Sequence, residues 1–171
     1  TAHREFGEGI AILSGVALLN QAFALLATSA DLSVEIRIDL IRLIASAVGS
    51  DGLIGGQVMD LHLRSGATDE GQLRKLNEMK TAALFTAAAE AGARLAGIKG
   101  DMLDTVRQFA LELGAAFQIA DDLLDDPVYA GQTGKDTGKD VNKPTILSKV
   151  GKADARRMLD LHLVAARQCL D

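Results

Sequence analysis

Apolar residues recur along this chain with helical spacing, and short runs of small or polar residues interrupt them. No segment alternates apolar and polar residues with the two-residue period of a half-buried strand. The pattern therefore predicts an all-α helical bundle. We expect helices over residues 6–27, 34–48, 53–63, 70–95, 102–125 and 153–170.

Two of these helices have unusual compositions. Residues 6–27 are apolar nearly all round, which is typical of a central helix. The run is nearly long enough to span a membrane, but Asn20, Gln21 and its small residues favour a buried core helix, so no transmembrane segment is expected. The paired Gly55 and Gly56 would each cost a helix about 1 kcal/mol against alanine, which indicates close backbone packing.

Length and composition narrow the classes of protein further. A chain of 171 residues is predicted to form a single domain, 1–171, with a substantial core. Hydrophobic residues make up 48% but aromatics only 4%, which favours closely packed helices over a sheet. The net charge of −5 argues against a nucleic-acid partner. The lone Cys169 excludes an internal disulfide framework, so the expected location is cytoplasmic.

Four carboxylates lie within six residues at the end of helix 102–125: Asp121, Asp122, Asp125 and Asp126. The C-terminal end of a helix carries partial negative charge, and like charges four residues apart repel by roughly 0.2–0.5 kcal/mol per pair. Hard oxygen ligands on one helix face suit Mg²⁺, which is often shared with substrate phosphates. A solvated acidic helix end is the alternative, and spacing alone does not decide between them.

Lysines accompany this acidic cluster. The glycine-containing segment that follows it carries Lys135, Lys139 and Lys143. Lys80 precedes an apolar helical stretch, where it can bury its stem and present its ammonium group to a phosphate, although a surface lysine would fit the same pattern. Carboxylates for a metal and a basic loop together suit a diphosphate ligand.

Residues 117–125 read Phe-Gln-Ile-Ala-Asp-Asp-Leu-Leu-Asp, and Gly-Lys and Asn-Lys-Pro-Thr follow. This stretch resembles the second aspartate-rich motif and following loop of the trans-isoprenyl diphosphate synthases, the family of the farnesyl and geranylgeranyl diphosphate synthases. Order, spacing and flanking residues all match. Gly-Gln-x-x-Asp over 56–60 and the pair Lys80-Thr81 occur in the same order as in that family.

The resemblance implies an isoprenoid-synthase-type helical bundle and a short-chain prenyltransferase. Such an enzyme condenses isopentenyl diphosphate with an allylic diphosphate through a Mg²⁺-assisted carbocation, and works as a homodimer. The roles implied for this chain are catalysis by Lys80, Thr81 and Gln118, substrate binding by Gln57, Asp60, Lys135 and Lys143, and metal binding by Asp121, Asp122 and Asp125.

The chain also departs from the family pattern. The first aspartate-rich motif, its arginine pair and the upstream residues that bind isopentenyl diphosphate do not occur in it. We therefore expect a fold that is incomplete at its N-terminal side, and no activity from these 171 residues alone.

Two alternatives follow. A truncated non-catalytic relative, or a regulatory subunit of a complete synthase, would lack the first motif, but it would not need to keep Asp121, Lys80 and Gln118 together. A class I terpene cyclase would carry a downstream Asn/Ser/Glu metal motif and many cavity aromatics. This chain has no tryptophan and a single tyrosine.

Overall fold

The structure is a computed structural model that describes residues 2–63, 70–124 and 146–171. These residues form helices and no strand, which confirms the all-α prediction. Contacts within the chain divide it into two compact units, Thr1–Arg42 and Leu43–Asp171. The units are described separately, and the single domain stays a prediction.

The first unit contains α1 (Ala2–Phe6), α2 (Glu8–Thr28) and the beginning of α3 (Val34–Val48). Gly7 separates α1 from α2 with a φ of 82°, a conformation that glycine adopts without steric cost. Ser33 caps α3, because its Oγ accepts a 3.3 Å hydrogen bond from the Ile36 N–H.

The helix α2 has no buried residue, and most of its apolar side chains are exposed; Leu18, for example, is 73% exposed. The burial expected for this helix is therefore not seen within the first unit. By length and composition, α2 is the one helix among the described residues that could cross a membrane. A core helix of a soluble bundle has the same length and composition.

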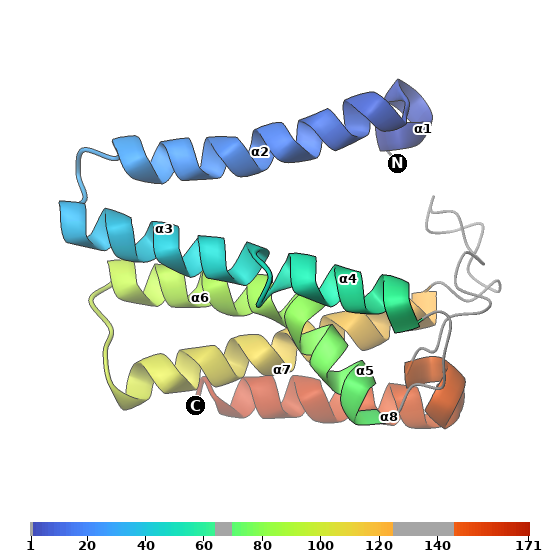
Figure 1. Cartoon of the computed structure of the whole chain (residues 1–171). Coiled ribbons are helices and arrows are strands. Elements are labelled where there is room, and N and C mark those ends of the chain that lie inside the picture. Colours follow the sequence, from blue (N-terminus) through green and yellow to red (C-terminus); the bar gives the residue numbers. More distant parts are fainter. Residues whose placement is uncertain (1, 64–69, 125–145) are drawn as a thin grey trace. The chain divides into compact units, whose positions relative to one another are not determined.

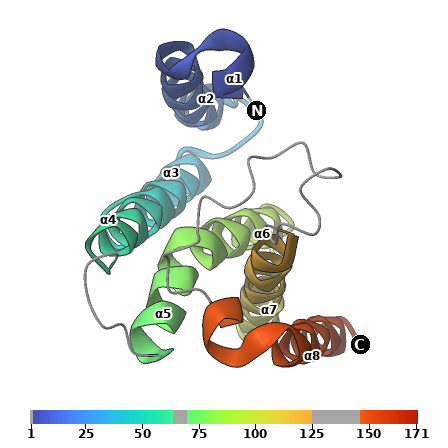
Figure 2. The ribbon, with the colours of Figure 1, turned by 90° about the vertical axis from the view of Figure 1, so that its right-hand side faces the viewer.

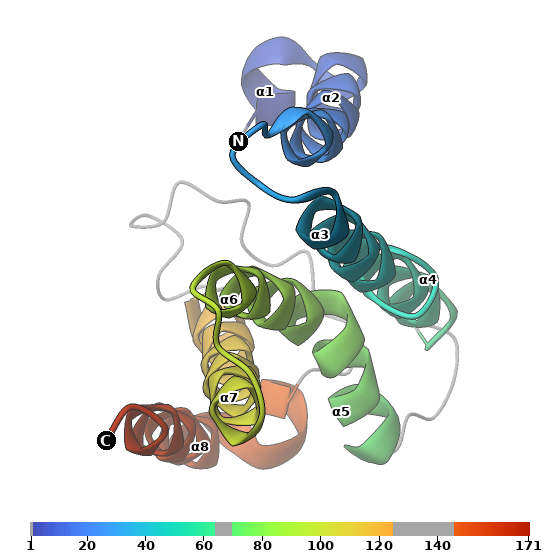
Figure 3. The same cartoon turned by 90° about the vertical axis from the view of Figure 1, so that its left-hand side faces the viewer.

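The second unit contains the end of α3 and the remaining helices. They are α4 (Leu53–Leu63), α5 (Glu70–Asn77), the π-helical turn η1 (Glu78–Ala82), α6 (Ala83–Leu95), α7 (Asp101–Leu124) and α8 (Ile146–Gln168). The helix α7 packs against both α6 and α8, and the three lie side by side in Figures 1, 2 and 3. The buried side chains of these three helices are mostly small, as the alanine-rich composition predicts. They include Ala87, Ala110, Ala116, Ile119, Ala155 and Ala166.

The prediction of one uninterrupted helix over residues 70–95 is wrong. The chain forms a π-turn at η1, where the Ala83 N–H donates to the carbonyl of Glu78, five residues earlier. The axes of α5 and α6 meet at an angle there (Figure 1), as is common at such turns. Ala82 in the turn is buried, whereas Leu84, two residues later, is 40% exposed.

The last helix begins earlier than the sequence pattern indicates. The helix α8 starts at Ile146 and is broken at Gly151, where φ is 81° and ψ is 165°. The part after this break corresponds to the predicted helix over 153–170. It ends at Gln168, two residues before the predicted end.

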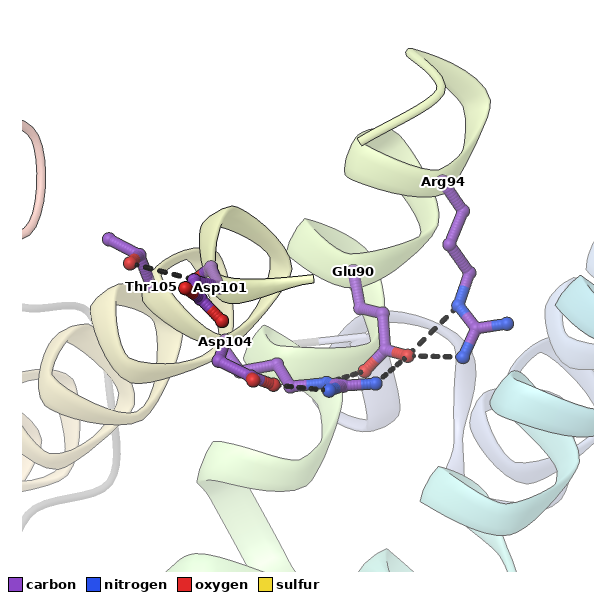
Figure 4. Close-up of polar contacts among 6 residues, drawn as sticks. Glu90, Arg94, Asp101, Asp104 and Thr105 are labelled. Atoms are coloured by element: carbon purple, nitrogen blue, oxygen red, sulfur yellow. Dashed lines mark hydrogen bonds and ion pairs between the residues drawn. The ribbon is translucent and has the colours of Figure 1, made fainter. Parts of the chain in front are cut away.

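A buried ion pair joins α6 to α7. Glu90, only 5% exposed, accepts hydrogen bonds of 2.6–2.9 Å from Arg94 on its own helix and from Arg107 on α7. Arg107 also donates to the exposed Asp104 at 2.7 Å. Figure 4 shows Glu90 and Arg94 on one helix and Asp104 on the next. The bonds from Arg107, opposed by burial and helped by those from Arg94, lower the pKa of Glu90 to about 2.

Replacing Glu90 tests this connection. We expect Glu90→Gln to lower the free energy of unfolding at neutral pH by about 3 kcal/mol, the lower end for breaking a buried pair, because both arginines keep access to water. The pKa of Glu90 falls from 4.5 to about 2 on folding. The stabilisation is therefore complete above pH 4.5 and is lost as the pH falls toward 2. Denaturant unfolding over a pH series measures both effects.

The matched control is Asp104→Asn. Asp104 accepts from the same arginine, but its side chain is 70% exposed, so its replacement should cost about 0–1 kcal/mol. Equal losses in the two variants would contradict the assignment of the stabilisation to the buried carboxylate.

Candidate functional site

Lys80 and Thr81, predicted as catalytic residues, both lie in the π-turn η1, which packs against α4 on one hand and α7 on the other. The ammonium Nζ of Lys80 donates to Oδ2 of Asp60 on α4 at 2.8 Å. The Asp60 side chain is 13% exposed and that of Lys80 is 32% exposed. Asp60, predicted to bind substrate, and Lys80, predicted to bind the diphosphate, are therefore in direct contact.

Thr81 faces α7 instead. Its hydroxyl donates to Oε1 of Gln118 at 2.7 Å, and Nε2 of Gln118 donates to Oδ1 of Asp122 at 2.8 Å. An ionised carboxylate can only accept, so the nitrogen of the amide must face Asp122 and its oxygen must face Thr81. The network itself thus fixes the orientation of Gln118. Gln118 and Asp122, four residues apart on α7, are therefore in direct contact.

Asp121 and Asp122 lie in the last turn of α7, and both are partly buried. Their oxygens are the donors that Mg²⁺ prefers, so the donor type fits this metal. Within the described residues, no group of three or more acidic, histidine or cysteine side chains could hold a metal ion. Asp125, the third predicted ligand, lies outside the described residues, so the complete donor set stays a prediction.

The remaining predicted residues divide into two groups. Gln57 is partly buried on α4, one turn before Asp60. Lys135 and Lys143 lie outside the described residues. Next to the Thr81–Gln118 contact, Phe85 of α6 and Phe117 of α7 pack with ring centroids 5.2 Å apart. One aromatic pair therefore lies beside the polar network.

Sequence reasoning missed two features of this site. The first is the ion pair between Asp60 and Lys80, whose residues belong to motifs twenty positions apart. The second is η1, since Glu78–Ala82 contains no glycine or proline that would indicate an irregular turn. Both features involve the packing of α4 and α7 against the turn, which connects segments far apart in the sequence.

Comparisons with known proteins agree with this architecture. The polyprenyl synthetase family model matches residues 1–156. The chain is 37% identical over 166 residues to the geranylgeranyl diphosphate synthase of Pseudescherichia vulneris, and 34% identical over 174 residues to the farnesyl diphosphate synthase of Bacillus subtilis. These alignments cover 97% and 99% of this chain. The chain therefore belongs to the polyprenyl synthetase family, which confirms the resemblance noted in its motifs.

A solved structure extends the comparison to the fold. The chain is similar to the geranyltransferase of Helicobacter pylori complexed with magnesium and isoprenyl diphosphate, with a TM-score of 0.88 and 30% identity. That similarity covers all of this chain, including α2, and 56% of the other. The chain likewise spans 53% and 59% of the two synthases named above.

Removing the Thr81 hydroxyl tests the polar network. Thr81→Val keeps the shape of the side chain but leaves Oε1 of Gln118 without this donor, so we expect the free energy of unfolding to fall by about 1–2 kcal/mol. Denaturant unfolding at neutral pH measures the change.

Thr86→Val is the matched control. Among the described residues, the hydroxyl of Thr86 on α6 is buried without a hydrogen-bond partner. Its removal should therefore leave the stability unchanged or raise it. A loss in Thr86→Val as large as in Thr81→Val would show that the Gln118 bond is not the cause.

Proposed function

We propose that this chain carries the site at which a short-chain trans-prenyltransferase holds and activates an allylic diphosphate, for condensation with isopentenyl diphosphate. The observation that carries the proposal is the pair of contacts made by η1. On one side of the turn, the ammonium group of Lys80 is held by the carboxylate of Asp60. On the other side, the neighbouring Thr81 begins a chain of hydrogen bonds that runs through Gln118 and ends at the carboxylate of Asp122.

Lys80 supplies positive charge to the diphosphate. An ammonium group has three donors, and the bond to Asp60 uses one of them. Asp60 therefore orients Lys80 while the other N–H groups can reach diphosphate oxygens. When the allylic carbon–oxygen bond breaks, its electron pair moves to the diphosphate, and a preorganised cation there stabilises the growing negative charge.

Asp121 and Asp122, together with Asp125, would hold Mg²⁺. The metal supplies charge neutralisation between these carboxylates and the diphosphate, which would otherwise repel each other. Gln118 orients the carboxylate of Asp122 through its amide hydrogen. Magnesium in the complex of the Helicobacter pylori geranyltransferase supports this choice of metal.

Thr81 and Gln118 lie beside the allylic cation in this proposal. The double bond of isopentenyl diphosphate attacks that cation, a new carbon–carbon bond forms, and loss of a proton restores a double bond in the longer prenyl diphosphate. Phe85 and Phe117, whose ring centroids lie 5.2 Å apart, are the aromatic side chains nearest to Thr81 and Gln118 in sequence. A homodimer in the cytoplasm remains part of the proposal, supported by the family and by the single cysteine.

Binding of inorganic diphosphate tests the metal site directly. Calorimetric titration of the protein should show binding in the presence of Mg²⁺ and none after chelation. Asp121→Asn and Asp122→Asn should each weaken it at least about tenfold, since even residues behind a metal ligand change affinity by 10–100-fold. Asp104→Asn, at the other end of α7, is the control and should bind as the wild type does.

Chain growth separates the catalytic proposal from a non-catalytic one. With Mg²⁺, isopentenyl diphosphate and an allylic diphosphate, the whole protein should form a longer prenyl diphosphate, whereas residues 1–171 alone should not. Asp121→Ala should lower kcat by at least about 100-fold, the scale of losing one electrostatic group at the reacting charge. Binding of Mg²⁺ and diphosphate without chain growth would support the non-catalytic relative instead, and no binding would contradict the proposed site.

A further inference from the structure

We infer that Gly56 of α4 and Gly114 of α7 are positioning residues, which hold the π-turn η1 close enough for Lys80 and Thr81 to make their contacts. The inference rests on the function proposed for that turn. The sequence indicated close packing for Gly56, and the structure confirms it and adds Gly114.

The distances show what each glycine permits. A Cβ atom added to Gly56 would lie 2.7 Å from the backbone nitrogen and 3.0 Å from Cα of Lys80. One added to Gly114 would lie 2.8 Å from Cα and 3.0 Å from Cβ of Ala82. All four neighbouring atoms belong to the backbone or to a Cβ, so none can swing aside as the end of a long side chain could. A methyl group at either position therefore requires a helix to move.

The two contacts hold the turn from different sides. Lys80 and Ala82 are two residues apart, so they lie on nearly opposite sides of the helix axis. The helix α4 meets one side through Gly56, and α7 meets the other through Gly114. Thr81 lies between these two contact points in sequence.

The functional contacts of η1 lead to the same two helices. Lys80 reaches Asp60, one turn beyond Gly56 on α4, and Thr81 reaches Gln118, one turn beyond Gly114 on α7. Each glycine thus lies four residues before the side chain that its helix offers to the turn. Displacing either helix by the distance that a methyl group needs would lengthen bonds of 2.7–2.8 Å. Misplacement of about 1 Å at a reacting centre can cost 100-fold in rate.

Alanine substitutions test the inference, with hydrogen exchange as the first measurement. Gly56→Ala and Gly114→Ala should raise the exchange of amides in Glu78–Ala82 about tenfold or more. Exchange in α8, whose main packing partner is α7 and not the turn, should rise much less than exchange in η1. Gly92→Ala on α6 is the matched control, since a Cβ there would meet nothing within 4 Å. It should leave exchange in η1 unchanged.

A second measurement connects the turn to its proposed ligand. The affinity for inorganic diphosphate with Mg²⁺ should fall about tenfold or more in both glycine variants and stay at the wild-type value in Gly92→Ala. If the wild type itself does not bind, the proposed function fails, while hydrogen exchange still decides whether the glycines position the turn.

Three results would overturn the inference. Exchange in η1 that matches the wild type would show that the glycines do not hold the turn. Faster exchange throughout the second unit, or loss of folded protein in both variants, would show a general packing role. Wild-type affinity for diphosphate in variants with a disturbed turn would show that its position does not matter to binding.

Discussion

The candidate site depends on one constraint, the confinement of the π-turn η1 between α4 and α7. In a regular helix, neighbouring residues point about 100° apart, and a helix packed on one partner presents only one face to it. Because η1 contacts two partners, the adjacent Lys80 and Thr81 bond to different helices. The described part of the site therefore consists of groups that converge on one turn.

A second connection joins α6 to α7 at a distance from the site. Glu90 lies nine residues after Thr81, and Arg107 lies eleven residues before Gln118. At 1.5 Å per residue, these separations are roughly 14 and 16 Å along two helices that run in opposite directions. The Glu90–Arg107 and Thr81–Gln118 bonds thus join α6 and η1 to α7 at two well-separated points. Two such points determine both the register and the rotation of the pair, which one contact cannot do.

The sequence allowed most helices to be placed, because apolar spacing and glycine-rich breaks are local signals. It also indicated that Gln118 and Asp122 would meet, since one helical turn separates them. It could not reveal η1, because Glu78–Ala82 contains ordinary helix-forming residues and the turn arises from packing. Nor could it reveal the bond from Arg107 to Glu90: Arg94, four residues from Glu90, is the partner that local spacing suggests.

The direction of the hydrogen bonds gives the two residues of the turn opposite electrostatic characters. Asp122 accepts from Gln118, which in turn accepts from Thr81, so the single hydroxyl proton of Thr81 is already used. The oxygen of Thr81 then offers lone pairs, which suit a positive charge, while the neighbouring Lys80 offers N–H donors, which suit a negative one. Breaking an allylic carbon–oxygen bond produces both charges at once. In the proposed reaction, a turn that presents a donor and an acceptor from successive residues would stabilise the two products of that cleavage separately, without any covalent bond to the protein.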